Sequence, residues 1–160
     1  MKTKIFVVSD IHYPDRLSKF PDFTGLYEDC DAVINLGDYT SLEVMKYVKG
    51  LKSKFFGIYG NMDETSVKES LPKTITIEIE GVKIGLLHGS GGPFAIENRV
   101  KQELGENLDA YIFGHSHRSF NKTIQDKFFF NPGAFSDSIH RYGYIYIEYR
   151  NIWGENAFVL

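Results

Sequence analysis

Short apolar runs, each followed at once by polar residues, constrain this chain more than any other feature. They are rich in valine, isoleucine and phenylalanine, and the clear cases are Ile5–Val8, Ala32–Leu36, Phe55–Tyr59, Val82–Leu87 and Ala110–Phe113. Strands that are buried on both faces of a sheet have this pattern in α/β proteins. We therefore predict an α/β fold whose strands end where the polar residues begin.

Two segments between these runs have helical periodicity. Thr40 and Glu43 fit a capping box with Thr40 as the N-cap, and the apolar residues that follow lie on one face. A second helix is predicted from Pro93 to Gly105, with apolar side chains spaced four residues apart. Both helices are long enough to cover a face of a sheet.

The remaining segments are mostly strand-like. Thr74–Glu80 alternates isoleucine with polar residues, and Gly81 turns the chain into the next run, which predicts a hairpin. Tyr13–Asp29 contains two prolines and is predicted to be a loop with one short helix at most. Because the strands outnumber those that one helix-flanked sheet needs, we predict two packed sheets with helices outside. The length, 160 residues, fits a single domain over residues 1–160.

Composition excludes several classes of function. The chain has 21 acidic and 18 basic side chains, a net charge of −3, so a long nucleic acid is not an expected partner. The single cysteine, Cys30, excludes an internal disulfide and a cysteine-based zinc cluster. No apolar run approaches the roughly 18 residues of a membrane span, and the start lacks the pattern of a signal peptide. We therefore expect a cytoplasmic protein without a membrane anchor.

Metal-ligating residue types follow five of the runs. The segments are Asp10-Ile11-His12, Gly37-Asp38, Gly60-Asn61-Met62-Asp63, His88-Gly89 and Gly114-His115-Ser116-His117. Each segment alone fits an ordinary turn or a buried histidine, but four of the five histidines of the chain stand here. Without thiolates, such a set suits manganese, iron, nickel, cobalt or zinc at higher coordination. Seven candidate ligands are too many for one ion, so two ions and hydrolytic chemistry are predicted.

The ordered series of these segments resembles the five-block signature of the calcineurin-like metallophosphoesterase superfamily. The match runs from residue 10 to residue 117, and Asn131-Pro132-Gly133 is a further block of its smaller members. In length the chain is similar to the small bacterial and archaeal phosphodiesterases, a branch that also includes a retromer scaffold subunit. The resemblance implies a four-layer sandwich of two mixed β-sheets flanked by helices.

The resemblance also implies the metal ligands, position by position. The first ion would be held by Asp10, His12, Asp38 and His117. The second would be held by Asp38, Asn61, His88 and His115, with Asp38 as the bridge. Manganese is the expected metal, with nickel, cobalt, iron and zinc as alternatives.

In the implied reaction, a hydroxide between the two ions attacks the phosphorus of a small phosphoester in line, most readily a phosphodiester. Asp38, Asn61 and His115 are the implied catalytic residues. Two further residues have alternative predicted roles. Asp63 is expected either to orient a bound histidine or water or to cap a turn. Arg118 is expected either to contact the substrate or to be solvated.

Two positions depart from the superfamily pattern. Met62 stands where many members have a histidine that protonates the leaving oxygen, and Ser41 stands where its acidic partner is common. A thioether cannot donate a proton, so substrates with poor leaving groups are expected to react slowly.

The competing reading is a non-catalytic protein-binding scaffold on the same fold. A scaffold need not keep every ligand, and this chain keeps all seven, which favours the enzyme. The apolar end Phe158-Val159-Leu160 is expected either to seal a homodimer or to lie as an edge strand in its own sheet.

Overall fold

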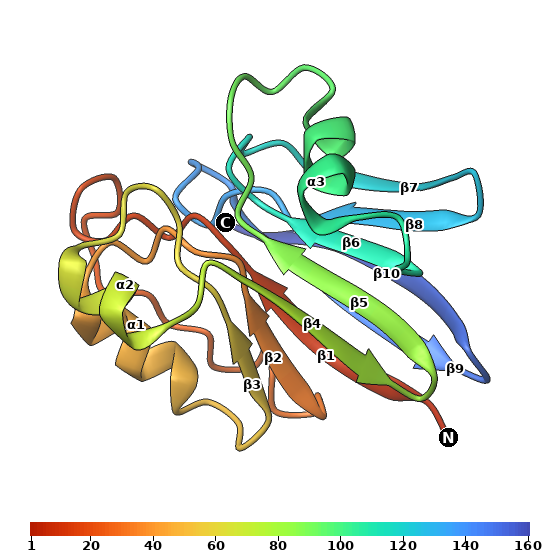
Figure 1. Ribbon diagram of the computed structural model, residues 1–160. Coiled ribbons are helices and arrows are strands. Elements are labelled where there is room, and N and C mark those ends of the chain that lie inside the picture. The colour runs from red at the N-terminus through yellow and green to blue at the C-terminus, as the bar shows by residue number, and fades with distance from the viewer.

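Two five-stranded sheets make up the centre of the computed structural model, which describes residues 1–160 (Figure 1). The first sheet has the order β10-β9-β1-β2-β3. Its strands are β1 (Thr3–Val8), β2 (Ala32–Asn35), β3 (Phe55–Gly57), β9 (His140–Glu148) and β10 (Asn151–Val159). β1, β2 and β3 are parallel to one another, whereas β9 runs antiparallel to both β1 and β10.

The second sheet has the order β4-β5-β6-β8-β7 and is also mixed. Its strands are β4 (Thr74–Ile79), β5 (Val82–Leu87), β6 (Ala110–Phe113), β7 (Phe120–Ile124) and β8 (Lys127–Asn131). β5, β6 and β8 are parallel, and the edge strands β4 and β7 are antiparallel to their neighbours. The carboxyl ends of β1 and β5 lie at the same end of the molecule, so residues that follow strands of the two sheets lie close together there (Figure 1).

Helices cover the outer faces of the two sheets. α1 (Leu42–Lys49) and α2 (Thr65–Ser70) lie beside the first sheet, and α3 (Ile96–Leu104) packs on β5 and β6 of the second (Figure 1). The predicted four-layer sandwich of two mixed sheets flanked by helices is therefore confirmed.

Three apolar clusters correspond to the three interfaces between these layers. The cluster between the sheets joins side chains such as Ile5 and Ile34 of the first sheet to Ile84 and Ile112 of the second. A second cluster lies between the first sheet and α1, and a third between the second sheet and α3. Burial of apolar area of this kind supplies most of the free energy that stabilises a fold.

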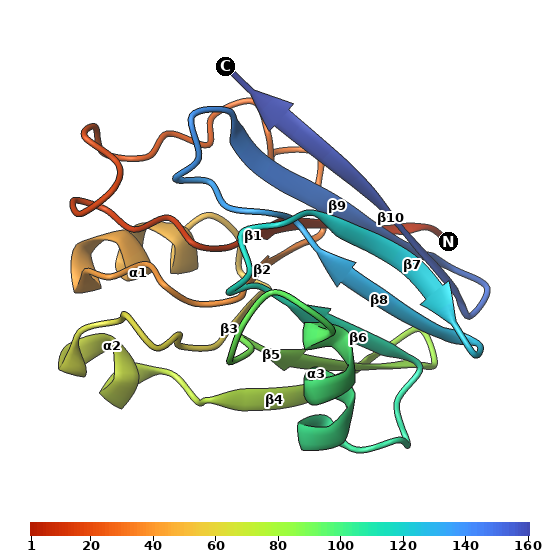
Figure 2. The same cartoon turned by 90° about the horizontal axis from the view of Figure 1, so that it is seen from above.

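Along one side the sandwich is nearly closed. β10 and β7 are edge strands of different sheets, yet they run close together, as Figure 2 shows. The side-chain amide of Asn121 donates to the Gly154 carbonyl across this seam, at 2.8 Å. Phe158 and Val159 of the apolar tail lie in β10, where they pair with β9, and the homodimer stays a prediction.

The two predicted helices form with different starts. Ser41, not Thr40, is the N-cap of α1, because its hydroxyl accepts from the Val44 N–H at 3.4 Å. Thr40 instead has a left-handed backbone (φ 68°) and is held by residues far away in the sequence. α3 begins at Ile96, three residues after Pro93, and ends before Gly105 as predicted.

Some elements differ from the sequence predictions. α2 was not predicted, because its six residues contain one apolar side chain, Val67, and therefore no period. Tyr13–Asp29 contains turns but no helix. None of the three helices has the length and apolar character needed to cross a membrane.

Candidate metal centre

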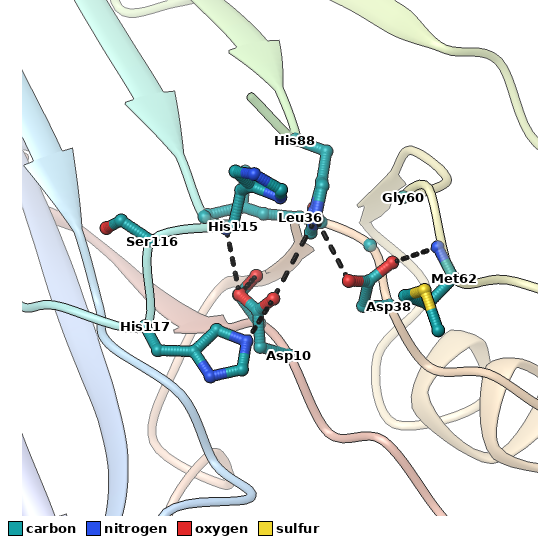
Figure 3. Close-up of polar contacts among 12 residues, drawn as sticks. Asp10, Leu36, Asp38, Gly60, Met62, His88, His115, Ser116 and His117 are labelled. Atoms are coloured by element: carbon teal, nitrogen blue, oxygen red, sulfur yellow. Dashed lines mark hydrogen bonds and ion pairs between the residues drawn. The ribbon is translucent and has the colours of Figure 1, made fainter. Parts of the chain in front are cut away.

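All seven predicted ligands follow strands that end at the shared edge of the two sheets. Asp10 and His12 follow β1, Asp38 follows β2, Asn61 follows β3, His88 follows β5, and His115 and His117 follow β6. Figure 3 shows Asp10, Asp38, His88 and His117 pointing toward one another. The site is thus built jointly by both sheets.

The backbone makes unusual turns at these strand ends. Five of the predicted ligands have a positive φ: Asp10 (57°), His12 (48°), Asp38 (57°), His115 (70°) and His117 (61°). The backbones also approach closely, since a Cβ on Gly114 would lie 2.7 Å from Asp10 Oδ2, and one on Gly60 would lie 2.6 Å from the Asp38 nitrogen. Left-handed residues and close contacts of this kind turn several side chains into one small volume.

Two overlapping groups of side chains have the geometry of metal sites. One group is Asp10, His12 and His117, and the other is Asp10, Asp38 and His88, each with its ligand atoms within 4.8 Å of one another. Asp38 Oδ2 lies 3.5 Å from His12 Nε2 and 3.1 Å from His88 Nε2, so it faces both groups. Asp10 belongs to both groups, although the resemblance assigned it to one ion only.

Two buried atoms in the centre of this cluster have no hydrogen-bond partner. They are Asp10 Oδ1 and His88 Nε2, which lie 3.8 Å apart. Burying a carboxylate oxygen and an imidazole nitrogen without partners is costly, and a bound cation would satisfy both. The donor set of imidazole nitrogens and carboxylate oxygens fits a divalent transition metal.

Surrounding groups orient these ligands. His88 Nδ1 donates to the Leu36 carbonyl at 2.6 Å, which turns Nε2 toward the carboxylates. Asp10 Oδ2 accepts from the Ser9 hydroxyl at 2.6 Å and from the His115 N–H at 3.1 Å, so Oδ1 is turned inward. The sequence analysis missed Ser9, whose signal is a hydroxyl directly before the first ligand.

The buried carboxylates and imidazoles shift the pKa values of one another. Burial would raise the pKa of Asp10, but His88, His117 and His12 outweigh it and hold the pKa of the carboxyl below its usual range. Burial would likewise lower the pKa of His88, but Asp10 and Asp38 raise it to about 9. The Asp10 carboxylate, whose Oδ1 lies 3.2 Å from His117 Nε2, raises the pKa of His117. In the absence of a cation, an imidazolium compensates the buried carboxylates.

Asn61 and His115 line the cavity over this cluster, and His115 belongs to neither group of ligand atoms. The cavity has a volume of about 320 Å³ and is lined by His12, Arg16, Asp38, Asn61, Met62, His115, Ser116 and His117. His115 Nε2 donates to the Gly91 carbonyl at 2.9 Å, so Nδ1 is the nitrogen left for an ion. The structure therefore places both residues beside the cluster, and their coordination stays a prediction.

Asp63 acts on the backbone and contacts no histidine. Its carboxylate is buried and accepts from the N–H groups of Asp38 (2.9 Å), Thr40 (2.8 Å) and Gly60 (2.7 Å). Of the two roles expected for Asp63, the structure shows the capping of turns, because these three donors tie together the loops after β2 and β3. Asp63 thereby positions the backbone of Asp38.

The cationic side chain in the cavity is Arg16, which the sequence analysis missed. Its backbone N–H donates to the His12 carbonyl at 2.7 Å, which ties this turn to a predicted ligand. Arg118, the predicted substrate contact, lines a neighbouring cavity instead. An arginine four residues after the first histidine was the available signal.

Comparisons with known proteins agree with this geometry. The profile of the calcineurin-like phosphoesterase superfamily domain matches residues 3–151. A probable metallophosphoesterase of Methanothermobacter thermautotrophicus is 32% identical over 134 residues, which cover 81% of this chain and 76% of that protein. A phosphodiesterase of Methanocaldococcus jannaschii is 29% identical over 143 residues, covering 81% and 82%.

Solved structures share the fold over almost the whole chain. A Thermotoga maritima protein determined by solution NMR is 29% identical with a TM-score of 0.77, and the match covers 98% of this chain and 99% of that one. Vps29 of Entamoeba histolytica, solved with zinc, is 22% identical with a TM-score of 0.75, covering 98% and 99%. The Vps29 likeness bears on the fold alone.

Proposed function

Because the chain belongs to the calcineurin-like phosphoesterase superfamily, we propose that it is a phosphodiesterase that uses two divalent ions to hydrolyse a small phosphodiester. The observation that carries this proposal is the pair of buried, unpartnered atoms, Asp10 Oδ1 and His88 Nε2, at the centre of two overlapping ligand groups. Manganese is the proposed metal, with nickel, cobalt, iron and zinc as alternatives.

The proposed ligand set follows the resemblance. Asp38 Oδ2 faces His12 on one side and His88 on the other, which supports Asp38 as the residue shared by both ions. The ions would supply a nucleophile at neutral pH and offset the charge on the phosphate oxygens. Asn61 adds a neutral oxygen at the cavity wall, so the site keeps net positive charge for an anionic substrate.

The chain's own side chains would bind and orient the substrate. Arg16 lines the cavity and would donate to the phosphate, because a guanidinium can form bidentate hydrogen bonds with two phosphate oxygens. His115 is held in one orientation by the Gly91 carbonyl, and His88 by the Leu36 carbonyl.

Met62 also lines the cavity over the metal centre, where its side chain is 51% exposed, and it supplies no proton to the leaving oxygen. Aryl phosphodiesters, whose phenolate departs unprotonated, suit such a site.

The experiment combines elemental analysis of the purified protein with hydrolysis assays under Mn²⁺, Ni²⁺, Co²⁺, Fe²⁺ and Zn²⁺. The substrates are bis(p-nitrophenyl) phosphate, p-nitrophenyl phosphate and cyclic nucleotides. We expect metal-dependent cleavage of the diester. Absence of hydrolysis with every ion, together with bound metal, would instead favour the scaffold alternative on the same fold.

Asp38→Asn tests the shared ligand. We expect it to lower turnover more than any other single ligand change, by at least about 100-fold, because both ions lose a charged contact near the reacting groups. Asp126→Asn, an exposed aspartate far from the cluster, is the matched control. Two tightly bound ions and near-normal turnover in Asp38→Asn would refute the bridging assignment.

A further inference from the structure

A second cavity adjoins the candidate metal centre. It has a volume of about 260 Å³, and its lining includes Phe94, Phe113, Phe120 and Arg118. Ser116 lines both this side cavity and the cavity over the metal centre, so the two cavities are neighbours that share this wall residue. Ser116 lies between the predicted ligands His115 and His117 in the sequence, which places the shared wall beside the candidate metal centre.

The walls of the two cavities differ in chemistry. The cavity over the metal centre has one apolar side chain, Met62, whereas the side cavity is lined mainly by three phenyl rings and smaller apolar side chains, with the charged groups of Arg118 and Glu97 beside them. Phenyl faces stack with other aromatic rings, and a guanidinium is attracted to the face of an aromatic ring. The volume is below the range of about 300–1,000 Å³ typical for drug-sized ligands, which suits a single ring system.

One wall is held firmly in place by Arg99. Its guanidinium donates to the carbonyls of Ser90 (2.9 Å), Phe94 (2.9 Å) and Gly92. These contacts fix the loop from Gly89 to Ala95 and present the Phe94 ring to solvent, where it is 87% exposed. The same loop contacts the metal centre, because the Gly91 carbonyl accepts from His115. The backbone that carries the exposed ring is thus held beside the candidate metal centre.

We propose that the side cavity binds an aromatic ring carried by one ester arm of the substrate, while the phosphate lies at the metal centre. The inference rests on the proposed phosphodiesterase function and names the class of its substrate: a diester with one aromatic arm on a short linker. Phe94 and Phe120 stack on the ring, and Arg118 faces it.

The test is calorimetric titration of the manganese-loaded protein with phosphonates, whose carbon–phosphorus bond is not an ester and is not hydrolysed. The ligands are benzylphosphonate, cyclohexylmethylphosphonate, methylphosphonate and inorganic phosphate. We expect benzylphosphonate to bind about fivefold or more tightly than methylphosphonate, the effect of one stacked ring. Cyclohexylmethylphosphonate, of similar size but without a π-face, is expected to bind less tightly than benzylphosphonate.

Phe94→Ala removes one wall and is expected to reduce the preference for benzylphosphonate while phosphate binding stays unchanged. Tyr149→Ala, which removes an 80% exposed aromatic ring in the turn between β9 and β10, is the matched control and should preserve the preference. Equal binding of benzyl and methyl compounds, equal binding of the two ring compounds, or an unchanged preference in Phe94→Ala would overturn the aromatic-arm proposal. Failure of inorganic phosphate to bind would refute the phosphoesterase proposal and this inference with it.

Discussion

Asp63 shows how one buried carboxylate determines the position of another. Three backbone N–H groups from two loops donate to it, and one of them belongs to Asp38. Asp38 in turn accepts from the Met62 N–H at 2.8 Å through Oδ1, which leaves Oδ2 toward the histidines. The orientation of Asp38 therefore depends on the contacts of Asp63 with both loops.

Asp63→Asn is expected to lower both stability and metal affinity. One amide oxygen cannot accept all three bonds, and an unpaired buried donor costs about 1–3 kcal/mol. Loss of an outer partner typically weakens metal binding by roughly 10–100-fold. Urea denaturation and manganese titration measure the two effects, with Asp126→Asn as control. Lower stability with unchanged manganese affinity would show that Asp63 holds the loops without positioning Asp38.

Met62 sets the expected dependence of rate on the leaving group. A well-placed general acid contributes about 10²–10⁴-fold, and no imidazole stands at this position, so the rate should rise steeply with the acidity of the leaving phenol. The measurement is a series of aryl phosphodiesters at fixed metal loading. Met62→His is expected to help alkyl substrates selectively and incompletely, because Ser41 serves as the α1 cap and offers no carboxylate.

A flat leaving-group series would contradict this expectation in one of two ways. Either another residue supplies the proton, or a step other than bond cleavage limits the rate. A burst of product in the first turnover would identify the second case.

At the scale of elements, the sequence predicted what depends on local pattern and missed what depends on distant partners. The strands and the ligand-bearing strand ends were predictable, because apolar runs and their polar ends are contiguous in sequence. Thr40 was misassigned because its N–H is taken by Asp63, 23 residues away. Arg16 was missed because its place in the sequence does not show that its turn lies over a cavity built with three other segments, the loops after β2, β3 and β6.

Ser41→Ala tests the observed cap of α1. We expect a loss of about 0.5–1 kcal/mol in the free energy of unfolding, at the low end for N-caps. The loss is small because the bond to Val44 is long and the Glu64 carboxylate also accepts from the first helical N–H, that of Leu42, at 2.8 Å. Urea denaturation measures it, with the exposed Ser18→Ala as control. An unchanged midpoint would contradict the cap assignment.

At the scale of the whole molecule, the candidate metal centre lies where the two sheets meet, and each sheet contributes some of its predicted ligands. Three apolar clusters, between the sheets and beneath the helices, pack without any contribution from an ion. A chain of this length buries roughly 70% of the surface of its unfolded form. The fold therefore has a source of stability that is independent of the ions.

Chelation is expected to abolish hydrolysis while far-UV circular dichroism stays largely unchanged. The melting temperature should fall somewhat, because ions that bind the folded state alone stabilise it by mass action. Readdition of Mn²⁺ provides the control by restoring activity. Loss of secondary structure on chelation would place the centre among structural metal sites.

The metal-free protein should also lose stability in alkaline solution. Asp10 and Asp38 raise the pKa of His88 to about 9 against an ordinary value of 6.5, so the folded state holds this proton more tightly than the unfolded state. The contribution is complete below about pH 6.5 and disappears as the pH rises through about 9. Melting temperatures of the chelated protein across this window measure it, and a rise with pH would contradict the assignment.

The left-handed backbone at five of the predicted ligands bears on how this protein would respond to selection for heat resistance. A side chain in that conformation costs roughly 1–2 kcal/mol relative to the right-handed one, and glycine is free of this cost. Glycine at position 115 or 117 would relieve the cost and delete a predicted ion ligand in the same step. Selection for thermal stability alone would therefore favour variants without catalytic activity. A screen that also selects for activity would retain the histidines.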